Sequence, residues 1–140
     1  MRISTRGRYG LKALLDIAAK PGGKRVNVAG IAKRHSISEA YLEQLVATLK
    51  KHGFVTSVRG AGGGYDLLRP PNEVSVAEVL NALEEPAPRC FDSDEPDGCR
   101  VGSCDQCTTK PVWEKLYGSV NEVLESYTLA DLITTKPKED

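Results

Sequence analysis

Residues 27–69 read NVAGIAKRHSISEAYLEQLVATLKKHGFVTSVRGAGGGYDLLR, and they contain the signals of two helices followed by two strands. Asn27 and Ser38 are favourable N-caps for two amphipathic helices, which a tight turn separates. Gly53 ends the second helix, and strand-forming residues then surround the glycine-rich run at 60–64. A helix, a turn and a helix followed by a β-hairpin predict a winged helix-turn-helix.

The sequence on either side of this unit adds further helices. Thr5 is the expected N-cap of a first helix, and Ser75 is the expected N-cap of a helix that follows the hairpin. A last, long helix is expected over residues 109–127, with Thr108 or Thr109 as its N-cap. The predicted fold class is therefore mainly α with a small β-hairpin, ending in a long C-terminal helix.

The net charge of the chain is zero, yet its two halves differ strongly. Residues 1–69 contain thirteen Lys and Arg against four Asp and Glu, whereas residues 70–140 contain six against fifteen. Lys and Arg neutralise DNA phosphates and supply much of the affinity of DNA-binding proteins. A basic half that also carries a winged helix-turn-helix thus predicts DNA binding, whereas the basic composition alone is equally compatible with an ordinary solvated surface.

The second helix of the motif would place its first turns in the major groove of DNA. Tyr41, Glu43 and Gln44 lie away from its apolar stripe; Gln can pair with adenine and Glu can accept from cytosine, although ordinary solvated positions are the alternative. Arg59, beside Gly60 at the wing tip, can enter a narrow A·T-rich minor groove. The candidate DNA-binding residues are Arg2, Arg6, Ser38, Tyr41, Glu43, Gln44, Arg59 and Gly60.

Other classes of protein are disfavoured. No run of about 18 apolar residues is present, so no membrane span is expected, and the N-terminus lacks the apolar core of a signal peptide. Tyr65 and Asp66 follow the glycine run where a nucleotide-binding P-loop needs Lys and Ser or Thr. We therefore expect a cytoplasmic protein with reduced thiols, whose cysteines are ligands or reactive groups rather than disulfides.

All four cysteines lie in residues 86–107, with the spacing C-x8-C-x4-C-x2-C. This stretch has three prolines, five acids and almost nothing to bury, so we interpret it as a loop that only a ligand could order. A zinc site, an iron–sulfur cluster and a CxxC thiol oxidoreductase are the alternatives. The long Cys90–Cys99 gap is unusual for zinc, and acids around Cys104 and Cys107 oppose a reactive thiolate, but spacing alone does not separate zinc from iron–sulfur.

The last long helix has an apolar seam with steps of three and four residues. Its members are Trp113, Leu116, Val120, Val123 and Tyr127. Such a heptad-like seam is typical of helices that pair two subunits, although burial in the core of one subunit is the alternative. A symmetric dimer would bind a palindromic operator in double-stranded DNA.

Four segments, in order, carry a resemblance to a known family. They are residues 6–11 (RGRYGL), 38–45 (SEAYLEQL), 58–65 (VRGAGGGY) and 107–113 (CTTKPVW). Over nearly its whole length the chain resembles the IscR-type transcriptional regulators and their NsrR and CymR relatives. The resemblance implies winged-helix homodimers joined by the long helix, with Tyr41, Glu43, Gln44 and Arg59 at positions that face DNA. It also implies cysteine desulfurase or cluster-assembly proteins as partners.

In the IscR and NsrR branches the resemblance implies an iron–sulfur cluster held by three cysteines. Alignment on the CTTKPVW segment assigns Cys90, Cys99 and Cys107 to these positions and leaves Cys104 as an additional cysteine. Where the IscR pattern has a histidine, this chain has Lys110, which cannot ligate iron when protonated. The fourth ligand is then Cys104 or an acid (Asp92, Asp94 or Asp97), and a [2Fe–2S] cluster is favoured over [4Fe–4S].

These observations predict a homodimeric transcriptional regulator that senses iron–sulfur or redox status, not an enzyme. Residues 1–71 would form the DNA-binding module and residues 72–140 the sensor and dimerisation region, with the cysteine loop at 86–107 and the dimer helix at 109–127. We hypothesise that cluster assembly or loss orders or releases the loop against the dimer helix. The runner-up is a winged-helix regulator with structural zinc or no metal, which responds to a small molecule or protein partner.

Overall fold

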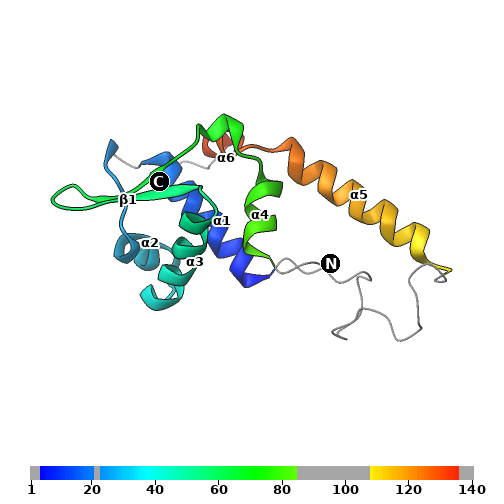
Figure 1. The fold of residues 1–140 in the computed structure, drawn as a ribbon, viewed down its shortest axis with the longest axis horizontal. Coiled ribbons are helices and arrows are strands. Elements are labelled where there is room, and N and C mark those ends of the chain that lie inside the picture. Colours follow the sequence, from blue (N-terminus) through cyan, green and yellow to red (C-terminus); the bar gives the residue numbers. More distant parts are fainter. Residues whose placement is uncertain (1–3, 21–22, 85–107, 136–140) are drawn as a thin grey trace.

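The computed structural model describes residues 4–20, 23–84 and 108–135. Its elements in chain order are α1 (Thr5–Ala19), α2 (Val28–His35), α3 (Glu39–Lys51), β1 (Val55–Val58), β2 (Gly64–Leu67), η2 (Pro71–Glu73), α4 (Val76–Leu83), α5 (Lys110–Ser126) and α6 (Leu129–Thr135). Helices α1–α4, the hairpin and α6 form one body, from which α5 extends away (Figure 1). This confirms a mainly helical fold with a small hairpin and a long C-terminal helix. None of the described helices is long and apolar enough to cross a membrane.

Polar N-caps begin α2, α3 and α4 where the sequence predicts them. In each cap a side-chain oxygen accepts from a backbone N–H three residues later, which satisfies one of the unpaired donors of the first turn. The pairs are Asn27 with Gly30 (2.8 Å), Ser38 with Tyr41 (3.2 Å) and Ser75 with Glu78 (3.2 Å). The boundaries of these helices are thus fixed by local sequence.

The expected N-cap of α1 is wrong by one residue. Ser4, not Thr5, has the extended backbone of a cap, and its Oγ accepts from the N–H of Gly7 at 3.1 Å. The N–H that Thr5 would have capped belongs to Arg8, and the carbonyl of Ser4 already accepts it at 3.1 Å as the first bond of the helix. Thr5 is therefore the first residue inside α1.

One hydrophobic core joins α1–α4, β1 and α6. Its fully buried side chains include Leu14 of α1, Leu42 and Leu49 of α3, Leu83 of α4 and Leu129 of α6. Burial of each contributes about 1.5–3 kcal/mol. Helices α4 and α6 lie beyond residue 71, yet they share this core with α1–α3. The predicted boundary between modules at residue 71 is therefore not a boundary in packing. The division of function between residues 1–71 and 72–140 stays a prediction.

Two glycines of α1 allow α4 to approach closely. A Cβ on Gly10 would press into the side chain of Leu83, and a Cβ on Gly7 would press into the carboxylate of Glu84. The same carboxylate accepts from the backbone N–H of Ser4 at 3.0 Å. It therefore lies at the N-terminus of α1, where the helix dipole favours an anion.

The wing is the predicted antiparallel hairpin, with Val55 opposite Leu67 and Val58 opposite Gly64. Its tip closes through a hydrogen bond from the N–H of Gly63 to the carbonyl of Gly60 at 2.9 Å. A Cβ on Gly63 would collide with the backbone carbonyl oxygens of Val58 and Gly60. The glycine-rich tip is thus required by a tight backbone turn.

Helix α5 packs little of its surface against the rest of the described residues. None of its residues, 110–126, is buried. Thr109 is its N-cap residue, but its backbone is helical (φ −95°, ψ −2°) rather than extended, and the expected side-chain cap is absent. The Thr109 hydroxyl instead accepts from the indole N–H of Trp113 at 3.0 Å. At the other end the carbonyl of Tyr127 accepts from the N–H of Val76 at 2.9 Å, so α5 is attached where α4 begins.

Candidate nucleic-acid interface

Helix α3 separates an apolar face from a polar face. Leu42, Leu45, Val46 and Leu49 are buried, and Glu39, Glu43 and Gln44 are exposed, as expected for a helix that offers its polar side to DNA. Tyr41 departs from the prediction, because it is half-buried and packs against the core. It precedes buried Leu45 by one helical turn, which places its ring at the edge of the apolar stripe.

Arg6 of α1 lies against the polar face of α3. Its Nη2 donates to the hydroxyl of Thr48 at 3.2 Å, and that hydroxyl donates to the carbonyl of Gln44 at 3.0 Å. The structure thus brings Arg6 and Gln44, two predicted DNA-binding residues, to one surface. Thr48, which joins them, is not among the predicted residues. Its position four residues after Gln44, on the same face of α3, could have identified it from the sequence.

The wing tip carries the other predicted contacts. Arg59 and Gly60 are exposed, and Gly60 has a φ of +96°, which L side chains rarely adopt. Lys50, in the last turn of α3, donates to the hydroxyl of Ser57 in β1 at 3.1 Å. This bond links α3 to the strand that leads to Arg59.

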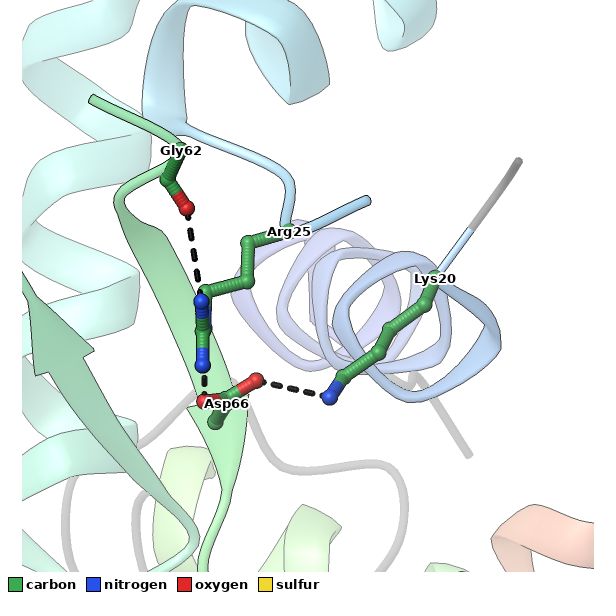
Figure 2. Close-up of polar contacts among 4 residues, drawn as sticks. All are labelled: Lys20, Arg25, Gly62 and Asp66. Atoms are coloured by element: carbon green, nitrogen blue, oxygen red, sulfur yellow. Dashed lines mark hydrogen bonds and ion pairs between the residues drawn. The ribbon is translucent and has the colours of Figure 1, made fainter. Parts of the chain in front are cut away.

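An acidic residue fastens the other side of the wing. Asp66 of β2 contacts the ammonium of Lys20 with Oδ1 at 2.9 Å and the Nε of Arg25 with Oδ2 at 2.7 Å (Figure 2). Arg25 also donates from Nη1 to the carbonyl of Gly62 at 3.4 Å. The ammonium of Lys20 and then the guanidinium of Arg25 hold the pKa of the Asp66 carboxyl below its ordinary value. The wing is therefore held by charge as well as by strand pairing.

The helix-turn-helix is held to α1 by a buried carboxylate. Asp16 of α1 is only 2% exposed, and it lies 3.1 Å from Nη1 of Arg34 and 2.7 Å from Nε2 of His35, both in the last turn of α2. Burial of a carboxylate is costly unless it is paired and hydrogen-bonded, so this cluster fixes how α2 sits on α1. The sequence signal was an acid between Ala13 and Ile17 on the apolar face of α1.

The remaining predicted residues lie outside the described part of the chain. Arg2 and all four cysteines (Cys90, Cys99, Cys104 and Cys107) belong to residues 1–3 and 85–107. Within the described ranges no group of three or more His, Cys, Asp and Glu is arranged to hold a metal ion. Glu84, bonded to the N-terminus of α1, is the last described residue before the cysteine segment.

This arrangement can be compared with known proteins. A family model described as an iron-dependent transcriptional regulator, Rrf2, matches residues 3–135. The chain belongs to the Rrf2 family. IscR of Sodalis glossinidius is 41% identical over 138 residues, covering 97% of this chain and 81% of the relative. IscR of Cereibacter sphaeroides is 40% identical over 135 residues, covering 95% and 87%.

Solved structures of Rrf2-type regulators have the same fold. The structure of T. potens IscR matches with a TM-score of 0.76 and 40% identity. The match covers 96% of this chain and 87% of the IscR chain. The structure of CymR, the global cysteine regulator of B. subtilis, has a TM-score of 0.77 and 34% identity, with coverage of 96% and 97%. The resemblance drawn from the four sequence segments is thereby confirmed, as is the expectation of a transcriptional regulator rather than an enzyme.

Proposed function

We propose that this Rrf2-family protein is a homodimeric regulator that binds a palindromic operator and senses iron–sulfur or redox status through a cysteine-ligated cluster. The observation that carries the DNA-binding part is the common exposure of the polar face of α3 and of the wing tip. Both belong to the half of the chain with thirteen basic and four acidic residues. Such a regulator would act in the cytoplasm, where its operator lies.

The DNA contacts follow from the chemistry of the exposed groups. Gln44 suits an adenine edge and Glu43 a cytosine amino group in the major groove, while Ser38 and Tyr41 lie in the same first turn. Arg59 with Gly60 suits a narrow minor groove, and Arg6 suits a phosphate beside the groove that α3 enters. Arg2 is proposed as a further phosphate contact on its charge alone.

The exposed apolar face of α5 supports dimerisation. Val112, Leu116, Val123 and Tyr127 are 60%, 41%, 57% and 48% exposed, which is unusual for large apolar side chains that repeat along one helix. Because none of the residues of α5 is buried by the described part of the chain, this exposure favours a second subunit over a core within one subunit. A second copy of α5 would cover it, and the two wings would then face two half-sites about 34 Å, or a multiple, apart.

The cluster would use thiolates of Cys90, Cys99 and Cys107, with Cys104 or a nearby acid as fourth ligand. Thiolates are the usual ligands of iron–sulfur clusters, and a [2Fe–2S] form would supply one-electron redox chemistry. Glu84 supports a link to DNA binding, because it joins the chain just before the cysteine segment to the α1 turn that holds Arg6. A cysteine desulfurase or assembly protein as cluster donor rests on the resemblance alone.

The likeness to CymR, described as a global cysteine regulator, supports a second candidate. In this reading the protein is a winged-helix regulator with structural zinc or no metal, and it responds to a small molecule or a protein partner. The DNA-binding and dimer surfaces would be the same. Only the group bound by the cysteines would differ.

Anaerobic purification separates these candidates. We expect brown protein with visible charge-transfer absorbance that Cys107→Ala abolishes and Cys104→Ala alters. Colourless protein with stoichiometric zinc, or with no metal, would support the second candidate. Operator binding is tested separately by selection from a random duplex library. A palindromic motif should be enriched, and absence of any enriched motif, with and without the cluster, would contradict the DNA-binding proposal.

A further inference from the structure

The wing and the chain between α1 and α2 form one charged cluster, which we call the wing clamp and define as Lys20, Arg25, Gly62 and Asp66 (Figure 2). Asp66 receives Lys20 on one oxygen at 2.9 Å and Arg25 on the other at 2.7 Å. Arg25 extends the cluster to the tip through the carbonyl of Gly62 at 3.4 Å. The clamp thus holds both the body of β2 and the loop beyond it.

The backbone beside the clamp reinforces the same placement. The N–H of Tyr65 donates to the carbonyl of Val26 at 3.1 Å, so the residue after Arg25 pairs with the edge of the hairpin. Gly64 has a φ of +148°, and a Cβ there would collide with the same Val26 carbonyl. These contacts seat the start of β2 against the segment that carries Arg25.

The charge of Asp66 is unexpected on a surface that binds phosphates. Residues 1–69 contain only four acids, and Asp16 is buried with its partners while Glu39 and Glu43 lie on α3. Asp66 pairs with Lys20 and Arg25, whose side chains are 44% and 39% exposed. Without Asp66, both cations would be available to DNA phosphates. An acid at this position lowers the general attraction of the wing for DNA, so its benefit must lie elsewhere.

We propose that Asp66 is a positioning residue that increases sequence discrimination at the expense of general DNA affinity. Through Arg25 and Gly62 it fixes the tip that carries Arg59, and it withholds Lys20 and Arg25 from phosphates. Loss of the clamp frees two cations for phosphate contacts that carry no sequence information and lets Arg59 reach its groove in several poses. This inference rests on the proposed operator binding.

The test compares wild type with Asp66→Asn by fluorescence anisotropy on two duplexes over a salt series. One duplex is the motif that wild type enriches from a random library, and the other is a scrambled duplex of the same length. We expect Asp66→Asn to bind the scrambled duplex at least as tightly, with a steeper salt dependence by about 0.9 for each freed cation that reaches a phosphate. The ratio of the two affinities should fall by about tenfold, the size of one base-pair mismatch.

Two further variants make the outcome decisive. Glu78→Gln removes the acid of another exposed pair, with Arg69 at 3.2 Å, and should leave the affinity ratio unchanged. Arg25→Lys keeps the charge but cannot span Asp66 and Gly62 with one fork, so it should lower the ratio even if Asp66→Asn proves unstable to heat.

An equal loss of affinity for both duplexes, or an unchanged ratio in Asp66→Asn and Arg25→Lys, would overturn the inference. Failure of wild type to enrich any motif would instead count against the proposed function. The two failures are therefore distinguishable.

Discussion

At the residue scale, three carboxylates on the DNA-binding half do different work. Asp16 is buried and joins two helices, Asp66 is partly exposed and joins the wing to the body, and Glu43 is exposed on α3. The first two act on structure because each has two basic side chains within 3.1 Å. Glu43 is the one that we expect to face a base edge.

Arg59 provides a direct test of the wing. Arg59→Ala should weaken binding to the enriched duplex by about five- to a hundredfold and remove its A·T preference beside the motif, because a base-edge contact is lost. Arg59→Lys should retain more affinity than preference, since its charge still meets phosphate. Anisotropy with A·T and G·C flanks measures both quantities. Unchanged preference in Arg59→Ala would exclude this residue from the minor groove.

The clamp should also respond to acid. Because Lys20 and Arg25 hold the pKa of Asp66 in the folded protein below its ordinary value, the stabilisation that the ionised Asp66 provides is present above the ordinary pKa and is lost as the pH falls through the folded pKa. We therefore expect the melting temperatures of wild type and Asp66→Asn to differ at pH 7 and 5, and the difference to shrink progressively as the pH is lowered below the ordinary pKa of an aspartate. Thermal unfolding followed by circular dichroism measures the difference. A gap that widens on acidification would contradict the assignment.

At the element scale, α4 connects the end of α5 to the start of α1. It begins where the N–H of Val76 bonds the carbonyl of Tyr127 after α5, and it ends where Glu84 reaches the N–H of Ser4 before α1. Between these ends it contributes Val79 and Leu83 to the common core. Helix α4 therefore links the contact with Tyr127 at one end to the contact with Ser4 at the other through residues packed in the core.

The close crossing of α1 and α4 predicts a cost for any side chain at Gly10. Gly10→Ala should destabilise the protein by about 1–3 kcal/mol, because its Cβ meets the side chain of Leu83 in a packed core. Gly118→Ala in α5 is the matched control, since no atom of the described residues lies within 4 Å of its Cβ position. That change should stabilise α5 by up to about 1 kcal/mol through helix propensity. Urea unfolding measures both, and equal effects would contradict the packing argument.

Glu84 should influence DNA binding although it lies off the proposed interface. Glu84→Ala removes the acceptor of the Ser4 N–H and loosens the α1 turn that holds Arg6. We expect a several-fold loss of operator affinity and a salt slope lower by about 0.9, the value of one phosphate contact. Glu84→Gln keeps an acceptor oxygen and should lose less.

A double-mutant cycle with Arg6→Ala is the control for this prediction. If Glu84 acts through Arg6, the second substitution adds little to the first. Full additivity of the two effects would show that Glu84 acts by another route.

At the scale of the whole molecule, α5 is the element whose surface the rest of the described chain leaves uncovered. It projects from the body with an apolar face and has no buried residue (Figure 1). A palindromic operator and a dimer through α5 are one prediction, because both follow from the same two-fold axis.

Val123→Asp tests that prediction. In the exposed part of the seam, an aspartate at position 123 should convert a dimer into a monomer at micromolar concentration, because an unpaired charge would be buried at the interface. Glu122→Gln, which changes the charge of a neighbouring exposed residue without adding a charge to the apolar face, should remain dimeric. Sedimentation velocity measures the mass. A dimeric Val123→Asp protein would place the interface elsewhere.

The sequence alone was sufficient for features that depend on neighbouring residues. The N-caps Asn27, Ser38 and Ser75, the glycine-rich hairpin and the apolar periodicity of α3 and α5 are local signals, because capping and amphipathic packing act within one or two turns. The division of charge between the halves was likewise visible in the composition. The cap of α1 was misplaced because Ser4 and Thr5 are adjacent and chemically equivalent candidates.

Contacts between distant residues were decided only by the tertiary structure. Ser4 meets Glu84 across 80 positions and Arg25 meets Asp66 across 41, and neither pairing leaves a periodic or spacing signal in the chain. The same holds for Asp16 with Arg34 and His35. Burial and exposure are also properties of the packed molecule. It therefore took the fold to show that the described part of the chain leaves Leu116, Val123 and Tyr127 exposed and that the wing is held by a carboxylate.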